Sequence, residues 1–156
     1  MKSVVVVGTN HDIQNGKSLK KDFELYLFDL CKKYDIQVIA EEINDDSNTI
    51  VAKSVSQNLG ITHIIIDPNP TEYERLNIKE YHKIEYEVMS SSIDNKTLRI
   101  RDEHHHPREL EWLKRILEHN TFPVLVICGS YHFESFSNLL SSNRLNVIST
   151  VSNWGS

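Results

Sequence analysis

The sequence predicts an α/β fold, a three-layer Rossmann-like domain with a mainly parallel sheet of about five strands and flanking helices. Three observations predict it. Short apolar runs alternate with amphipathic stretches, as in parallel strands joined by crossover helices. The length of 156 residues suits a single domain, 1–156. With 39% hydrophobic and 25% charged residues, the composition is that of an ordinary globular protein.

The predicted strands are short apolar runs, several of them rich in β-branched residues. In chain order they are residues 3–7, 36–40, 61–66, a run beginning at Val124, and residues 145–149. Continuous apolar strands of this kind are typical of a parallel sheet that is covered on both faces.

The stretches between these strands carry helix signals. Ser18 and Ser47 stand where they can cap the helices that follow the first and second strands. Gly60 lies where a left-handed residue would end the second helix. Pro107 suits the first turn of the helix before the fourth strand, and a last helix is expected from about Tyr131.

Residues 69–106 interrupt this pattern and are predicted to be an insertion, which serves as a lid or binding loop or forms ordinary structure over the sheet. Apolar residues between 81 and 88 recur at helical spacing, and residues 97–101 suggest a short extended piece. Residues 104–106 are three consecutive histidines. Because neighbouring side chains point in different directions, we expect this run to be a solvated loop with at most one member at the edge of a site.

Charge and cysteine content narrow the class of protein. A net charge of -5 argues against broad binding to nucleic acid. The apolar runs are too short for a signal-peptide core or a membrane span. Cys31 and Cys128 fall in predicted core elements and are expected to be reduced thiols, which favours a cytoplasmic location. The expected partner is a small-molecule or peptide substrate, and a homo-oligomer is left open.

Two motifs of the same form point to a site. Gly8-Thr9-Asn10-His11 follows the first predicted strand, and Gly129-Ser130-Tyr131-His132 follows the fourth. Open α/β proteins bind ligands beyond the carboxyl ends of their strands. Since each motif delivers a histidine to that position, we expect His11 and His132 to share one site.

Other polar residues belong at the same edge of the sheet. Glu41 and Glu42 follow the second strand, and Asp67 follows the third. Side-chain alternation favours Glu42 over Glu41. Arg108 starts a helix that enters from this edge, four residues before Trp112. Each residue also has a plainer interpretation, as a turn residue, a cap or a solvated surface group.

The residue types point to hydrolysis by one of two routes. In the first, His11, Glu42 and His132 bind Zn, Mn or Fe, and the metal activates a water molecule. In the second, no cofactor is needed: a histidine deprotonates water and Arg108 stabilises negative charge or holds an anionic substrate group.

Residues beside the predicted catalytic group are candidates for ligand binding. They are Asn10, Lys17, Asp67 and Ser130. An alternative function uses the same edge without catalysis, as a module in which helix N-termini, Lys17 and Arg108 hold a nucleotide or another anion.

The paired motifs, the acid at Glu41 or Glu42, and the segment from Arg108 to Trp112 together resemble the TraB/Tiki-like superfamily. That superfamily includes the erythromycin esterases and ChaN-like haem-binding proteins. The resemblance implies a hydrolase-like site at the carboxyl edge of the sheet, metal-dependent in Tiki-type proteases and metal-free in the esterases. It does not select a substrate.

Overall fold

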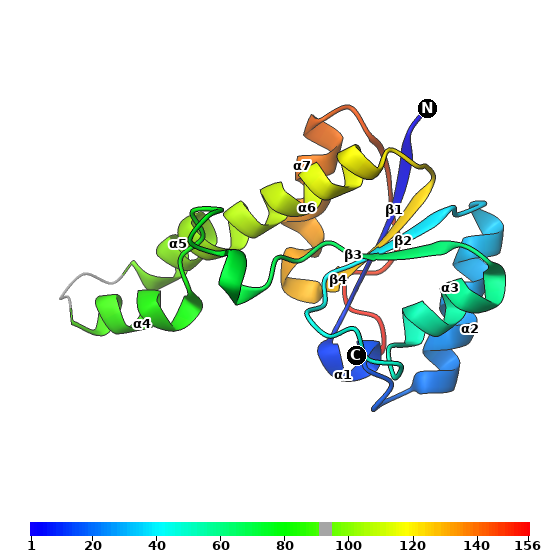
Figure 1. Cartoon of the computed structure of the whole chain (residues 1–156), viewed down its shortest axis with the longest axis horizontal. Coiled ribbons are helices and arrows are strands. Elements are labelled where there is room, and N and C mark those ends of the chain that lie inside the picture. Colours follow the sequence, from blue (N-terminus) through cyan, green and yellow to red (C-terminus); the bar gives the residue numbers. More distant parts are fainter. Residues whose placement is uncertain (91–94) are drawn as a thin grey trace.

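A computed structural model, which describes residues 1–90 and 95–156, shows an all-parallel sheet of five strands in the order β3-β2-β4-β1-β5 (Figure 1). The strands are β1 (Ser3–Thr9), β2 (Val38–Glu41), β3 (Thr62–Ile65), β4 (Val124–Gly129) and β5 (Asn146–Ser149). The sheet confirms the predicted α/β class and the positions of all five predicted strands.

Helices cover both faces of the sheet, which gives three layers (Figure 1). On one face lie α2 (Lys20–Lys33) and α3 (Val51–Leu59), and on the other lie α6 (His106–His119) and α7 (Phe133–Ser142). Side chains of a strand alternate between faces. Val5 of β1 therefore packs in the core under α2 and α3, whereas Val6 packs in the core with Trp112.

The strand order creates a topological switch point between β1 and β4, which are neighbours in the sheet. From β1 the chain crosses past β4 to reach β2, and from β4 it crosses past β1 to reach β5. The chain thus leaves the two adjacent carboxyl ends in opposite directions. Such a point is where open α/β sheets bind ligands, and both Gly-x-x-His motifs lie at it.

The C-terminal segment covers the β1 side of this switch point. The Gly8 amide donates to the Val151 carbonyl at 2.9 Å, and the Trp154 amide donates to the Gly8 carbonyl at 2.7 Å. A Cβ atom at Gly8 would lie 2.0 Å from the carbonyl oxygen of Ser152. Only glycine fits under this segment, so the β1 side of the switch point is covered.

Two predicted helix caps are wrong, and one is confirmed. Helix α2 starts after Leu19, which has a left-handed φ of 50°, and Ser18 does not cap it. Helix α3 starts after Ile50. Ser47 does not cap it, since its hydroxyl accepts from the Thr49 amide in a local turn before the helix. Gly60 ends α3 in the left-handed conformation at a φ of 69°, as predicted.

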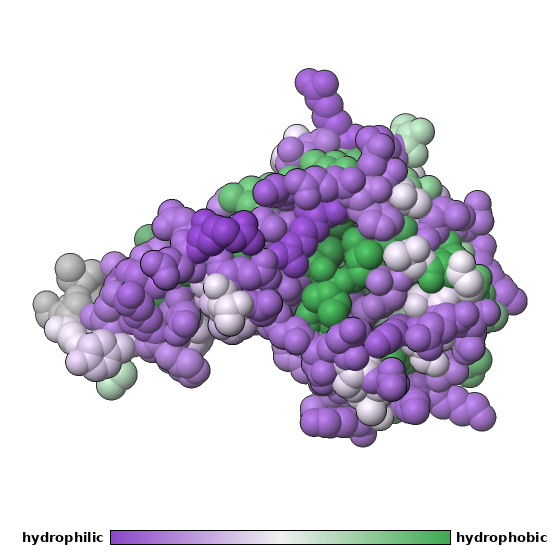
Figure 2. Space-filling view, in the orientation of Figure 1, coloured by the Kyte–Doolittle hydropathy of each residue, from purple (hydrophilic) through white to green (hydrophobic). Residues whose placement is uncertain are grey.

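The predicted insertion projects from the sheet as an arm (Figure 1). It contains η1 (Pro70–Glu72), α4 (Tyr81–Met89) and α5 (Lys96–Ile100), while its residues 91–94 lie outside the described part of the chain. The helix expected at 81–88 is confirmed as α4. In Figure 2 the visible surface of the arm is mainly hydrophilic, and apolar residues gather where the arm meets the sheet, around the edge strand β3.

The extended piece predicted at 97–101 is wrong, because α5 runs through a π-helical turn, η2 (Arg101–His105), directly into α6. An i,i+4 ion pair between Arg99 and Glu103 supports this continuous helix. Pro107 lies in the first turn of α6, as predicted.

The solvated loop predicted at 104–106 is also wrong, because these histidines belong to the same helix. His104 is buried, and its Nδ1 donates to the Lys79 carbonyl at 2.8 Å. His105 is half-buried and His106 is exposed. Single π-turns inside helices are frequent at functional sites.

Both cysteines are buried free thiols, as expected. Burial raises the pKa of Cys31 to about 11, and it also raises the pKa of Cys128. Within residues 1–90 and 95–156, none of the helices combines the length and the apolar character needed to cross a bilayer.

Candidate functional site

A buried cluster of charged side chains lies at the carboxyl edge of the sheet, with Arg108 at its centre. The Nη2 of Arg108 donates to Glu42 Oε2 at 2.7 Å. Its Nε and Nη2 donate to the two Asp67 oxygens at 3.0 and 3.1 Å. Burial disfavours the charge, but the Asp67 and Glu42 carboxylates raise the pKa of Arg108 above its ordinary value. Helix α6 is thereby joined to the ends of β2 and β3.

His132 lies between two carboxylates beyond the end of β4, in the short helix η3 (Ser130–His132). Its Nδ1 is 2.8 Å from Glu109 Oε2, and its Nε2 is 3.7 Å from Glu42 Oε2. An ionised carboxylate only accepts hydrogen bonds, so Nδ1 carries the proton of the neutral ring. The Nε2 lone pair then faces Glu42 at a distance beyond hydrogen bonding.

The second Gly-x-x-His motif also fixes Glu42. The Gly129 amide donates to Glu42 Oε1 at 2.7 Å. A Cβ atom at Gly129 would lie 3.4 Å from the same oxygen, so the glycine allows the carboxylate to approach the backbone. Both ends of this motif therefore serve the cluster, through an amide at Gly129 and an imidazole at His132.

Glu41 lies outside this cluster, although it is fully buried. It is 2.8 Å from Nε2 of His63, and it accepts a hydrogen bond from Gln14 Nε2 at 3.0 Å. Consecutive residues at a strand end point to opposite sides, which explains why Glu41 and Glu42 have separate partners. The preference for Glu42 as the residue beside Arg108 agrees with this geometry.

The structure does not bring His11 to His132. His11 is exposed at the start of the short helix α1 (His11–Gln14), which Asn10 caps by accepting from the Ile13 amide at 3.0 Å. The C-terminal segment over Gly8 occupies the space beside this end of β1. His11 lines a separate shallow pocket with Asn10 and Gly155.

The remaining predicted ligand-binding residues divide between the cluster and the surface. Asp67 is in the cluster, where it also accepts from Trp112 Nε1 at 2.8 Å. Lys17 and Ser130 are exposed. Neither makes an ion pair or side-chain hydrogen bond with another residue that the structure describes.

The residues present do not fit the predicted metal site. No group of three or more His, Cys, Asp or Glu side chains in the described ranges could hold a metal ion. His11 is absent from the cluster. Glu42 Oε2, the oxygen that faces His132, already binds the Arg108 cation, which would repel a divalent ion.

A pocket of about 850 Å³, here called the Tyr131 pocket, is lined by two residues that contact His132, although the buried His132 ring is not itself part of its wall. Its wall includes Glu109, which binds His132, and His105, whose ring centroid is 4.7 Å from that of His132. Burial lowers the pKa of His105 to about 4, and repulsion from Arg108, and from His132 and His104 when they are protonated, adds to this shift. His105 is therefore a neutral aromatic wall at neutral pH.

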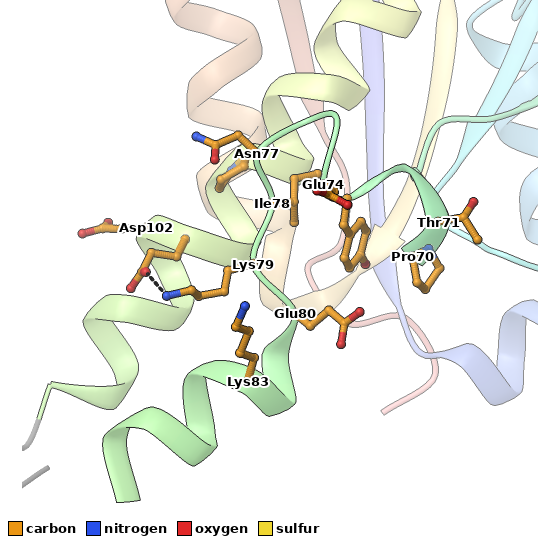
Figure 3. A pocket seen from close by; sticks show the side chains of 12 residues that line it. Pro70, Thr71, Glu74, Asn77, Ile78, Lys79, Glu80, Lys83 and Asp102 are labelled. Carbon is orange, nitrogen blue, oxygen red and sulfur yellow. Dashed lines mark ion pairs between the residues drawn. The ribbon is translucent and has the colours of Figure 1, made fainter. Parts of the chain in front are cut away.

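A second pocket of about 1010 Å³, the Tyr73 pocket, lies against other parts of the arm, and its polar wall includes Lys79, Glu80 and Lys83 (Figure 3). The Tyr73 ring meets the His104 ring edge-on at 5.9 Å, and burial raises the pKa of Tyr73. None of the described contacts joins the wall of this pocket to His132. Of these two pockets, the Tyr131 pocket is therefore the one whose wall contacts the imidazole, through His105 and Glu109.

Sequence reasoning missed two members of the site. Glu109 is not among the residues predicted from the sequence, yet it binds Nδ1 of His132 at 2.8 Å. His104 was assigned to a loop, yet its Nε2 is 3.4 Å from Arg108 Nη1. For His104 the signal was helical spacing. His104 lies four residues before Arg108, so a helix that continued back through residue 104 would place these two side chains on one face.

Fold and site together define an all-parallel α/β domain with a buried His, Glu, Asp and Arg cluster at the carboxyl edge of its sheet, beyond β2, β3 and β4. Comparison of the chain with protein-family models, curated proteins and solved structures gave no match.

Proposed function

We propose that this protein is a small hydrolase in which His132 activates a water molecule directly, in a site of the TraB/Tiki-like type without a bound metal. The observation that carries the proposal is the position of His132 between Glu109 at 2.8 Å and Glu42 at 3.7 Å. One ring nitrogen is held by a hydrogen bond, and the other keeps a free lone pair. That is the arrangement required of a general base.

The two carboxylates have different roles in this reaction. As Nε2 takes a proton from water, the resulting hydroxide attacks the electrophilic atom of the substrate and the ring becomes an imidazolium. Glu109 orients the ring and stabilises its new charge through Nδ1. Glu42 adds a negative charge beside Nε2, where burial strengthens the attraction. The imidazolium can then protonate the leaving group.

Arg108 acts in this proposal as a positioning residue. Its Nε and Nη2 are occupied by Asp67 and Glu42, so its charge is matched within the protein. This arrangement favours holding Glu42 in place over holding an anionic substrate group. It also removes support from the alternative of an anion-binding module, since Lys17 is exposed and makes no described contact with Arg108. The two buried thiols are consistent with a cytoplasmic enzyme, and we include that location in the proposal.

The test is a screen of 4-nitrophenyl esters, bis(4-nitrophenyl) phosphate and a labelled peptide with wild-type protein, His132→Gln and His119→Gln. His119 is an exposed histidine at the end of α6 and serves as the matched control. At least one substrate class should be hydrolysed, and His132→Gln should lower kcat by about 10²-fold or more while His119→Gln does not.

Circular dichroism establishes that both variants are folded. Equal turnover by His132→Gln and wild type, or no hydrolysis of any class, would contradict the proposal. A chelator should leave turnover unchanged, and loss of turnover with the chelator would replace direct activation by the metal route.

A further inference from the structure

The Tyr131 pocket combines an apolar wall with a cationic rim. We propose that it binds an amphipathic monoanion, so that the substrate is an ester or amide with a flat or aliphatic body that carries one carboxylate or similar group. This inference rests on the proposed function, because it takes the pocket beside His132 as the substrate pocket of that site.

Aromatic and aliphatic side chains form the apolar part of the pocket. Tyr81 comes from α4 of the arm and Tyr131 from η3 after β4, and Ile100 of α5 is a buried apolar residue of the wall. Tyr131 is 81% exposed, which leaves its ring available to a ligand. It meets His105 edge-on, with 5.7 Å between ring centroids. A volume of about 850 Å³ is within the usual range for small-molecule sites, roughly 300–1,000 Å³.

Two cations of the arm form the rim. Lys96 belongs to α5 and Arg101 to the π-helical turn. Their present partners are Glu85 at 2.9 Å and Asp102 at 3.1 Å. Ion pairs between such exposed side chains contribute little, about 0–1 kcal/mol, so a ligand carboxylate can replace these partners.

Two acids also line the pocket, Asp102 and Glu109, and both are already engaged, Asp102 by Arg101 at 3.1 Å. Glu109 Oε2 accepts from both His132 and Ser135, each at 2.8 Å. The rim therefore offers positive charge to a ligand, whereas the inner wall offers Glu109 and His105 beside the imidazole. An anion held at Lys96 and Arg101 would direct the apolar body of the molecule inward, toward His132.

Isothermal titration calorimetry with 2-naphthoate and its neutral analogue 2-naphthamide tests this. Wild type should bind naphthoate about tenfold more tightly than naphthamide. The double variant Lys96→Gln/Arg101→Gln should reduce that preference to less than about twofold. The double variant Arg75→Gln/Lys83→Gln, which removes the same charges elsewhere on the insertion, should keep it. Tyr131→Ala should weaken both ligands several-fold and leave the preference unchanged.

Equal affinity of wild type for the two ligands, no measurable binding of either, or an equal effect of the two double variants would overturn the inference. Binding should persist in His132→Gln, because that ring performs chemistry and the rim supplies affinity. Naphthoate binding without hydrolysis of any substrate would contradict the proposed function alone. Hydrolysis with no preference for anionic substrates would contradict this inference alone.

Discussion

Arg108 holds both oxygens of Asp67, through Nε at 3.0 Å and Nη2 at 3.1 Å, in a two-point contact that is buried beneath the arm. The same carboxylate accepts from Trp112 Nε1 at 2.8 Å and from Asn44 Nδ2 at 3.2 Å. A bidentate pair fixes direction as well as distance. Asp67 thus sets the angle at which α6 approaches the end of the sheet, and with it the position of Glu109 next to His132.

The first prediction concerns the strength of this contact. Arg108→Met leaves the carboxylates of Asp67 and Glu42 buried without a cation, so the free energy of unfolding should fall by about 3–5 kcal/mol. The double variant Arg108→Met/Asp67→Asn should lose less than the sum of the two single variants, because the pair is removed together. Guanidinium chloride titrations measure these values.

Arg115→Met is the matched control for this series. Arg115 lies on the same helix, but its partners Glu111 and Glu72 are nearer solvent, so its removal should cost less than about 1 kcal/mol. Additive effects at Arg108 and Asp67 would contradict the described contact.

The second prediction separates orientation of His132 from packing. Glu109→Gln keeps an oxygen that can accept from Nδ1 but removes the charge that stabilises the imidazolium, so kcat should fall by about 10–10²-fold with a smaller change in KM. The acidic limb of the pH profile of kcat should shift as well. Glu118→Gln, at an exposed position of the same helix, should behave as wild type. An unchanged pH profile in Glu109→Gln would limit Glu109 to a structural role.

The third prediction is a loss of stability in mild acid. Burial lowers the pKa of His105 from 6.5 to about 4, and it also lowers the pKa of His104. Between these values the unfolded chain binds protons that the native protein does not, so stability falls as pH drops from about 6.5 toward 4. Because His105 is only half-buried, its share should be about 1–2 kcal/mol.

Urea titrations at pH 7.5 and pH 5 measure this loss. His105→Gln should reduce it, whereas His82→Gln, at an exposed histidine of α4, should not. The same loss in His105→Gln and wild type would show that other groups are responsible.

The fourth prediction contrasts the two motif glycines. Gly8→Ala places Cβ 2.0 Å from the Ser152 carbonyl oxygen, which forces the C-terminal segment away and should cost about 2–3 kcal/mol. Gly129→Ala brings Cβ only to within 3.4 Å of Glu42 Oε1 and should cost less than about 1 kcal/mol. Thermal unfolding of the two variants provides the comparison, and an equal decrease in Tm would contradict it.

Much of the fold was predictable because its signals are local. Valine-rich runs such as that of β1 are buried on both faces and read as strands from composition alone. The location of the cluster followed from the rule that the carboxyl ends of parallel strands lie at the same edge of a sheet. The alternation of side-chain direction along a strand separated Glu42 from Glu41. Local patterns and connectivity therefore placed Glu42, Asp67, Arg108 and His132 at one edge, and the structure brings these four residues into one cluster.

The remaining features depend on contacts that no local pattern records. His11 repeats the motif of His132, but residues 151–154, far along the chain, pack against Gly8 and close that half of the edge. The histidine run was expected to be a solvated loop because adjacent side chains point in different directions, but the run lies in a helix that passes through a π-helical turn. Glu109 contacts His132 only because of the angle at which α6 crosses the sheet.

The position of β4 between β1 and β2 has a consequence for synthesis on the ribosome. When residues 1–65 have emerged, the first three strands cannot form their final sheet, since the place between β1 and β2 belongs to residues 124–129. The nascent chain must keep apolar strand edges unpaired until then, which exposes it to mispairing and to capture by chaperones. His132 follows directly after β4, the strand that joins β1 to β2, so the buried cluster and the centre of the sheet are finished at nearly the same moment of translation, and only the edge strand β5 remains to be added.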